Sequence, residues 1–260
     1  CETIAKITPE ILYKCYNTFY DPSNMVITVA GDIDAEKVLQ KIKDKVKNCK
    51  EKPNIERYYG EISPNVYNKK VEKNMDVNMP LCVLGFKDTK SQRLRMAGYK
   101  EDNKDLIKRD IAIEIILSLI AGESSNLEEE LYNEGKITKP FDISFTFEED
   151  YAYSSFGFES NNVDEVIDRL KNEIEKLKKN GIDVEEMERT KKMLYGGFIR
   201  IFNDSTNMAM ALTSDYFKGI NTLDNVDLFK TVDKEYITEV LNEHFDFDNM
   251  AISIVNPNTK

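Results

Sequence analysis

The pattern of hydrophobic and polar positions divides the first 50 residues into a helix, a strand and a second helix. Residues 8–20 begin with a capping threonine, a proline at the first helical position and an acidic first turn, which predict a helix. Residues 25–30 are almost continuously apolar and follow a turn-forming stretch, which predicts a short buried strand. A second helix is predicted after Asp34 because its apolar residues recur on one face. Those apolar residues are Val38, Leu39, Ile42 and Val46.

Residues 51–65 carry two prolines and a glycine among polar residues and have little periodicity, which is typical of a linker. We therefore expect residues 1–50 and 66–260 to belong to different domains. A polar, basic stretch at 91–103 is predicted to be a surface loop. Its basic residues and Lys90 would meet an acidic peptide terminus or a partner only if they were held in place, and a mobile loop is the simpler interpretation.

Beyond residue 66, strands and helices alternate. The helix at 105–121 is apolar on almost all sides and should be central and buried. The order predicts an α+β fold in which helices pack on a mixed, largely antiparallel sheet. The predicted elements are strands 66–76 and 79–87, helices 105–121 and 127–133, strands 141–147 and 153–158, two long helices opened by capping boxes at Asn162–Glu165 and Asp183–Glu186, helices 208–217 and 236–245, and a strand at 250–255.

Two segments match without gaps at an offset of 225 residues, which sets Asn24 on Asn249. Residues 8–31 and 233–256 then both read as a capped helix, a turn and a strand, although any helix-turn-strand pair shares part of this pattern. A repeat of this period predicts a duplicated domain. The end of the first copy would lie in residues 1–50 and the second copy in 66–260.

Composition and charge exclude several kinds of partner. The formal net charge is −11, so binding by phosphate neutralisation is disfavoured and no nucleic acid is expected. No apolar run approaches the roughly 18 residues that span a bilayer, so no membrane association is expected. The four cysteines lie far apart and form no C-x-x-C pair, which indicates reduced, structural thiols. Without a secretory signal, a cytoplasmic location is expected.

The residues that could carry chemistry are few. His244 is the only histidine, and at the 225-residue offset it falls on Phe19 near a helix end, so a packing or surface role is favoured over a ligand role. Runs of glutamate at 128–130 and 185–186 are typical of solvated helix faces, because adjacent carboxylates point to different sides. No catalytic residue and no metal ligand is therefore predicted in this chain.

Two motifs resemble the M16 (insulinase-like) peptidase family. YNTFYDPSNM at 16–25, followed by VITVAGD, is similar to the element that closes the first α+β domain of that family. AGESSNL at 121–127, with Leu131, Glu134 and Gly135 after it, resembles the "G.SS.L…L…G" segment of the second domain. LYNEG at 131–135 is most similar to the bacterial subclass whose zinc-bearing subunit pairs with a related zinc-free subunit. With the repeat, the resemblance covers essentially the whole chain.

The resemblance implies a zinc endopeptidase that takes peptides into a chamber between two clamshell halves. Its inverted H-x-x-E-H motif needs two histidines, and this chain has one, so the motif and the zinc would lie before Cys1 in an N-terminal catalytic domain of a longer parent. The chain would then form the chamber wall and the interface to that domain and to a second M16-type subunit. The alternative is an M16-like scaffold or peptide-binding subunit without peptidase activity.

One departure from the family concerns substrate contacts. Some second domains supply an arginine and, seven residues later, a tyrosine that bind the substrate carbonyl. Here the matching position is Tyr132, and the segment 135–138 after it is shorter and lacks the tyrosine, so the pair is absent. Tyr132 and Lys136 remain the residues expected to face a substrate. If half of its own domain lies elsewhere, the segment 1–50 should also expose an apolar patch.

Overall fold

The computed structural model describes residues 2–46, 55, 63, 65–90, 104–148 and 151–258. The chain divides into two compact units. The N-terminal unit comprises Cys1–Gly60 and Ile201–Ser214, and the sheet unit comprises Glu61–Arg200 and Asp215–Lys260. The expected linker at 51–65 and the expected loop at 91–103 lie almost entirely outside the described residues, so the expected domain limits stay a prediction.

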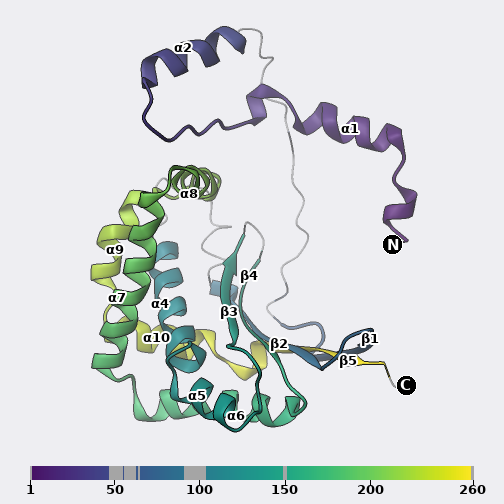
Figure 1. Ribbon diagram of the computed structural model, residues 1–260, viewed down its shortest axis with the longest axis vertical. Coiled ribbons are helices and arrows are strands. Elements are labelled where there is room, and N and C mark those ends of the chain that lie inside the picture. The colour runs from purple at the N-terminus through teal and green to yellow at the C-terminus, as the bar shows by residue number, and fades with distance from the viewer. Residues whose placement is uncertain are drawn as a thin grey trace. The chain divides into compact units, whose positions relative to one another are not determined.

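The sheet unit is built on a mixed sheet whose described strands lie in the order β1-β5-β2-β4-β3 (Figure 1). β1 and β5 are parallel, and every other neighbouring pair is antiparallel. The predicted mixed, largely antiparallel sheet in an α+β fold is therefore confirmed. The strands are β1 Lys70–Met75, β2 Leu81–Lys87, β3 Asp142–Phe147, β4 Ala152–Glu159 and β5 Met250–Pro257.

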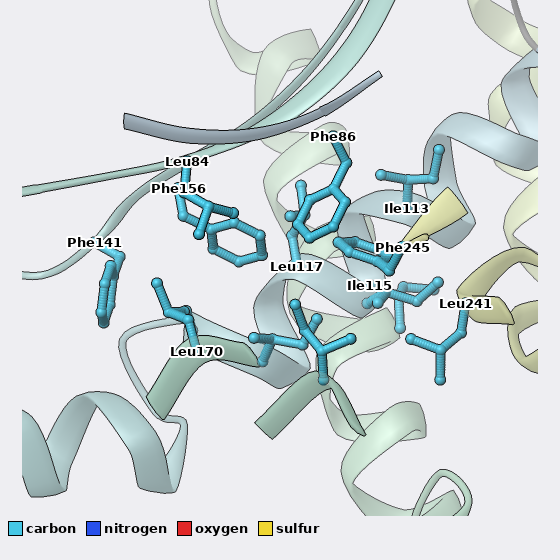
Figure 2. Packing of buried hydrophobic residues seen from close by; sticks show 14 of the residues in the cluster. Leu84, Phe86, Ile113, Ile115, Leu117, Phe141, Phe156, Leu170, Leu241 and Phe245 are labelled. Carbon is cyan, nitrogen blue, oxygen red and sulfur yellow. The ribbon is translucent and has the colours of Figure 1, made fainter. Parts of the chain in front are cut away.

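Helices pack on one face of this sheet and enclose the hydrophobic core. Figure 2 shows Leu84, Phe86 and Phe156 from the strands lying against side chains of α4, α6 and α10. The helices of the sheet unit are α4 Lys104–Ala121, α5 Asn126–Asn133, α6 Val163–Asn180, α7 Val184–Arg200, α9 Asn225–Thr231 and α10 Lys234–His244, and α8 Ser205–Lys218 is shared between the two units. None of the described helices is long and apolar enough to cross a membrane.

Helix α4 occupies the centre of the core, as its sequence predicts. Ile113, Ile115 and Ile116 have no exposed surface, although they lie on different sides of the helix. Other elements contact α4 around much of its circumference, namely α5, α6, α7, α9, α10 and β3. An apolar surface of this width is stable only when several elements cover it, which makes α4 the organising helix of the unit.

Local capping signals were correct at some helix starts and wrong at one. The Ser125 hydroxyl accepts a hydrogen bond from the Glu128 amide at the start of α5, and the Asp183 carboxylate accepts one from the Glu186 amide at the start of α7. The capping box predicted at Asn162 does not form, because the Asn162 side chain makes no capping hydrogen bond. The Asn162 backbone amide, which the Glu165 carboxylate of a capping box would accept from, donates instead to the Ser160 hydroxyl at 2.8 Å, and the Glu165 carboxylate pairs with the ammonium group of Lys136 at 2.6 Å.

The N-terminal unit contains the two predicted helices, α1 Pro9–Phe19 and α2 Ala35–Lys45, but not the predicted buried strand between them. Residues 25–30 are extended and pair with no strand among the described residues, and Ile27 is 59% exposed. The prediction of a buried strand is therefore wrong for this chain. A strand is stabilised by the backbone hydrogen bonds of its neighbours, and the described residues supply none here.

The two segments related by the 225-residue offset have the same local structure. Helix α1 and helix α10 begin and end at equivalent positions, and so do the short 3-10 helices Pro22–Asn24 and Phe247–Asn249. Both helices are capped at their first turn, by Thr8 and by Asp233. A common origin of the two segments stays a prediction. The remaining 3-10 helices are Ile4–Lys6, Ile201–Asn203 and Thr222–Asp224.

Candidate functional site

Five polar or charged residues far apart in the sequence meet inside the sheet unit, and we call them the polar cluster: Asp88, Arg109, Ser154, Glu243 and His244. Asp88 directly follows β2 and Ser154 lies on β4, where β2 and β4 pair in antiparallel register. The backbone amide of Asp88 donates to the carbonyl of Ala152 at 2.8 Å, which extends this pairing. Helix α4 carries the arginine, and the C-terminal turn of α10 carries the other two residues.

A buried ion pair forms the rigid part of the cluster. The guanidinium of Arg109 donates two hydrogen bonds to the Asp88 carboxylate, each 2.9 Å long, and both side chains are only 2% exposed. A third hydrogen bond of 3.1 Å runs from Arg109 to Glu243, which also accepts from the Lys90 ammonium at 2.8 Å. Two parallel N–H···O bonds fix both distance and orientation, so the pair ties α4 to the end of β2.

His244 completes an arrangement that superficially resembles a nucleophile, a base and an orienting acid. Its Nε2 lies 2.7 Å from the Ser154 hydroxyl, and its Nδ1 lies 3.8 Å from the Asp88 carboxylate, too far for a hydrogen bond. All three side chains are buried, and Asp88 is already engaged by Arg109. No substrate can reach the serine, so the cluster packs and orients the core. Of the packing or surface role favoured for His244, its burial in the core fits the packing alternative.

The environment shifts the protonation equilibria of the cluster. Burial alone would raise the pKa of Asp88, but the neighbouring His244 imidazole and Arg109 guanidinium hold it well below its ordinary value. Burial lowers the pKa of His244, and the Asp88 carboxylate opposes that shift only in part. The folded protein at neutral pH therefore contains an ionised Asp88 and a neutral His244.

These residues do not fit a zinc site. Zinc binding needs three or four histidine, cysteine or carboxylate ligands around one point. Within the described part of the chain, no group of three or more such side chains could hold a metal ion. The single histidine is buried against Ser154, and the carboxylate nearest to it is engaged by an arginine. No step of a zinc-dependent reaction can therefore be assigned to these residues.

Tyr132 and Lys136 lie where α5 ends and the chain turns. Tyr132 is 56% exposed. The ammonium of Lys136 forms the ion pair with Glu165, and its backbone amide donates to the carbonyl of Leu131 at 2.8 Å. Lys136 is therefore partly committed to the fold, while Tyr132 is open to solvent. Their expected role in facing a substrate stays a prediction.

The face of the sheet opposite the helices presents a mixture of small, polar and larger apolar side chains, the last including Val83 and Tyr153. Alternation along β2 and β4 buries one set of residues and leaves the other set accessible. Val83 pairs in register with Ser253 on β5, and both are exposed. The hydroxyls of Ser144 and Ser155 lie 2.9 Å apart across β3 and β4. An antiparallel sheet can keep one face in water in this way.

An acidic pair on α4 is the second place where charges gather. Asp110 is half-buried, and burial, followed by the charge of Glu114 one turn later, raises its pKa well above the ordinary value. Glu114 also lines a cavity of about 130 Å³ together with Ile143, Phe145 and Leu194. The cavity is small and mostly apolar in lining, and the described acidic groups around it form no metal site.

Sequence reasoning did not anticipate the polar cluster, because its members come from four separate elements. Two weak signals were present. Asp88 follows the end of an apolar strand, and Arg109 is the one arginine in the largely apolar helix 105–121. A buried charge of each sign predicts that the two meet, since an unpaired one would be costly.

Comparison with known proteins gives a consistent result. Residues 6–194 match the family model described as the peptidase M16 inactive domain. YmfH of Bacillus subtilis, named an uncharacterized zinc protease, is 26% identical over 258 residues, which cover 98% of this chain and 58% of YmfH. A solved structure from Alicyclobacillus acidocaldarius, described as an M16-like peptidase, superposes with a TM-score of 0.86 at 27% identity and covers 99% of this chain and 60% of that chain.

A further solved structure, the peptidase M16 inactive domain from Pseudomonas fluorescens, has the same fold. It superposes with a TM-score of 0.78 at 15% identity, and the match covers all of this chain and 60% of the other. The chain thus spans about three fifths of the length of these relatives.

Proposed function

Because the chain belongs to the M16 peptidase family, we propose that it is the noncatalytic region of a zinc-dependent metallopeptidase and that its sheet forms a wall of the peptide chamber. The match to the inactive-domain model supports the noncatalytic part of the proposal. So does the presence of a single histidine, which is buried. The zinc and the residues that bind it belong, in this proposal, to another region of the longer parent.

The open face of the sheet is the observation that carries the chamber-wall role. A wall that contacts many unrelated peptides should be hydrated and should lack deep apolar pockets, because such pockets would retain some substrates and exclude others. The exposed positions on β2, β4 and β5 are Val83, Tyr153 and Ser253, and the half-buried Ser155 lies on the same face. The neighbouring edge strand β3 pairs with β4 on one side only among the described strands, so its other edge is available to a peptide backbone.

The remaining expectations follow from the same proposal. The parent's N-terminal catalytic domain and a second M16-type subunit would be its protein partners, and a short or unfolded peptide its substrate. Tyr132 and Lys136 would lie at the margin of the wall. A cytoplasmic location and the lack of nucleic-acid and membrane partners stay predictions from the sequence.

Zinc content and peptide hydrolysis test the noncatalytic assignment. Both are measured for the 260-residue chain and for the longer parent, each alone and mixed with a related zinc-free subunit. Zinc and activity only with the longer parent would support the proposal. Stoichiometric zinc in the 260-residue chain alone would contradict it, and inactivity of every mixture would favour the scaffold.

Two tryptophan substitutions in the active parent test the chamber wall. Ser253→Trp adds bulk on the open face, whereas Asp168→Trp adds the same bulk on the exposed side of α6. The first should lower kcat/KM severalfold for peptides of ten or more residues and less for tripeptide reporters, because only long peptides need the space. The second should change neither. Equal effects of both variants, with unchanged melting temperatures, would argue against the wall.

A further inference from the structure

Two tyrosines on the open face of the sheet stack on each other. The ring centroids of Tyr151 and Tyr153 lie 6.0 Å apart with 27° between the ring planes, at the end of the sheet where β3 turns into β4. The two side chains stay 45% and 42% exposed. Ala152 and Ser154, which alternate with them, are buried, so both tyrosines point away from the helices. The pair therefore presents two aromatic rings on the face that the proposed function gives to a peptide.

A carboxylate lies on the same face beside this pair. The backbone amide of Glu148 donates to the carbonyl of Tyr151 at 2.7 Å, which continues the register of β3 and β4 by one pair and sets the two residues opposite each other. Phe147 is buried, so alternation places the Glu148 side chain on the open face. Within the described part of the chain, no hydrogen bond or ion pair engages its carboxylate. An unpaired anionic group thus lies one strand away from two aromatic rings.

These three side chains fit a guanidinium group better than any other side-chain group of a peptide. The guanidinium of arginine is planar and weakly hydrated, so it can stack on an aromatic ring while its N–H groups bind a carboxylate through two parallel hydrogen bonds. A lysine ammonium is a strongly hydrated point charge without a flat face, and a neutral ring would leave the carboxylate unused. The formal net charge of −11 adds a long-range attraction for cationic peptides, and the sequence continues after Glu148 with two more acidic residues.

One positive group, Lys87, lies on the same face but on the other side of the pair. Lys87 is in register with Tyr153 on the β2 side, whereas Glu148 lies on β3's side. Two strand spacings separate these charges, about 10 Å, which is the distance over which physiological salt screens exposed charges. The Lys87 ammonium is also engaged, since it donates to the carbonyl of Ser63. Lys87 therefore disfavours a cation on the β2 side and leaves the side of Tyr151 and Glu148 open to one.

We infer that Glu148, Tyr151 and Tyr153 form a binding site for an arginine side chain of the peptide that lies on the open face. The inference rests on the proposed function, which places a peptide there, and it adds the side chain that the wall selects. The site is a stacked surface beside a carboxylate and not a deep pocket, so it ranks peptides by affinity and excludes none.

Binding to the 260-residue chain gives the first test, and it needs no hydrolysis. The chain has no tryptophan, so the fluorescence anisotropy of a short peptide with one terminal tryptophan follows binding directly. Four such peptides differ only at a central arginine, lysine, glutamine or phenylalanine. The arginine peptide should bind roughly fivefold or more tightly than the glutamine peptide, with lysine between them. Equal affinities, no binding of any peptide, or tightest binding of the phenylalanine peptide would overturn the inference.

Matched variants test the residue assignment. Glu148→Gln and Tyr153→Ser should each remove most of the preference for arginine over glutamine, whereas Tyr153→Phe should keep it because the ring remains. Asp168→Asn removes a carboxylate from the exposed side of α6 and should leave the preference unchanged. Thermal unfolding of every variant checks that the fold is intact. An unchanged preference in Glu148→Gln, or an equal loss in Asp168→Asn, would overturn the assignment.

These outcomes are separable from those of the proposed function. In an active parent, the preference should appear in KM with kcat unchanged, because the arginine contact is the same in the ground state and the transition state. Arginine-selective binding without hydrolysis in any mixture would keep the inference and lose the peptidase proposal. An active parent without any arginine preference would do the reverse.

Discussion

Replacing Arg109 with methionine should be the most damaging single change in the polar cluster. Methionine keeps an apolar stem of similar length but removes both hydrogen bonds that Arg109 donates to the Asp88 carboxylate, a group that is 2% exposed and keeps the bond from the Lys90 backbone amide at 3.2 Å. Removing one partner of a buried ion pair costs about 3–5 kcal/mol, because the remaining charge stays desolvated. The bond to Glu243 adds little, since that side chain is 38% exposed. Against a typical total stability of about 5–15 kcal/mol, the loss is large.

Urea unfolding followed by far-ultraviolet circular dichroism measures this cost, since the chain has no tryptophan to report by fluorescence. Asp88→Asn and the double variant complete a cycle. The double variant should lose less than the two single variants together, because it leaves no unpaired charge. A cost below about 1 kcal/mol for Arg109→Met, or strict additivity in the cycle, would refute the reasoning.

The pH dependence of the same variant supplies an independent check. In the wild type, the lowered pKa of Asp88 means that its stabilisation is present above the ordinary aspartate value and is lost as the pH falls below it. Without the arginine, burial should instead raise this pKa in the folded variant. The loss of stability in the variant should then grow as the pH rises from the ordinary aspartate value to the raised pKa, level off above it, and shrink on acidification from pH 7 to pH 5. An equal deficit at both values would contradict the burial argument.

Three further predictions concern single residues. Gly181→Ala should lower the free energy of unfolding by about 1–3 kcal/mol, because φ +79° with ψ 171° is a glycine-only conformation. Gly196→Ala inside α7, where no atom lies near the added methyl, should raise it by about 0.5–1 kcal/mol. Thermal unfolding measures both changes, and two changes of the same sign would contradict the prediction. Burial raises the pKa of Cys82 to about 12, so iodoacetamide at pH 8 should alkylate the exposed Cys15 in the native protein and Cys82 only after unfolding. Mass spectrometry of peptides measures this labelling, and rapid labelling of Cys82 in the native protein would contradict the prediction. Burial lowers the pKa of His244, so near pH 6.5 the unfolded chain binds a proton that the folded chain does not bind. The free energy of unfolding should therefore fall from pH 7 toward pH 5, and His244→Gln should reduce that slope. An unchanged slope in the variant would contradict this.

Where a segment's structure depends on its own residues, the sequence predicts it well. The all-round apolar surface of residues 105–121 indicates a central helix, and the cap at Asp183 and the stop at Gly181 depend on neighbouring backbone groups. Predictions fail where a distant group decides. The Glu165 carboxylate of the expected capping box pairs with the distant Lys136, and residues 25–30 have strand-like composition but pair with no strand among the described residues.

The polar cluster shows the same limit for the candidate site. Position 88 can meet position 109 only after α4 packs on the sheet, and position 154 reaches the histidine only through the pairing of β2 with β4. Charge alone predicts that a buried aspartate and a buried arginine should meet. It does not say which serine or glutamate will join them, because that choice depends on register and helix packing.

The parallel pairing of β1 with β5 has a consequence for biosynthesis. The register joins Lys70 to Ile252, so the strand between β1 and β2 is synthesised long after both of them. At about 5–20 residues per second, β1 and β2 wait roughly 10–40 s for their shared neighbour, with the facing edges of both strands unpaired. A nascent chain in this state exposes two unpaired strand edges, and such edges favour pairing with other chains and aggregation.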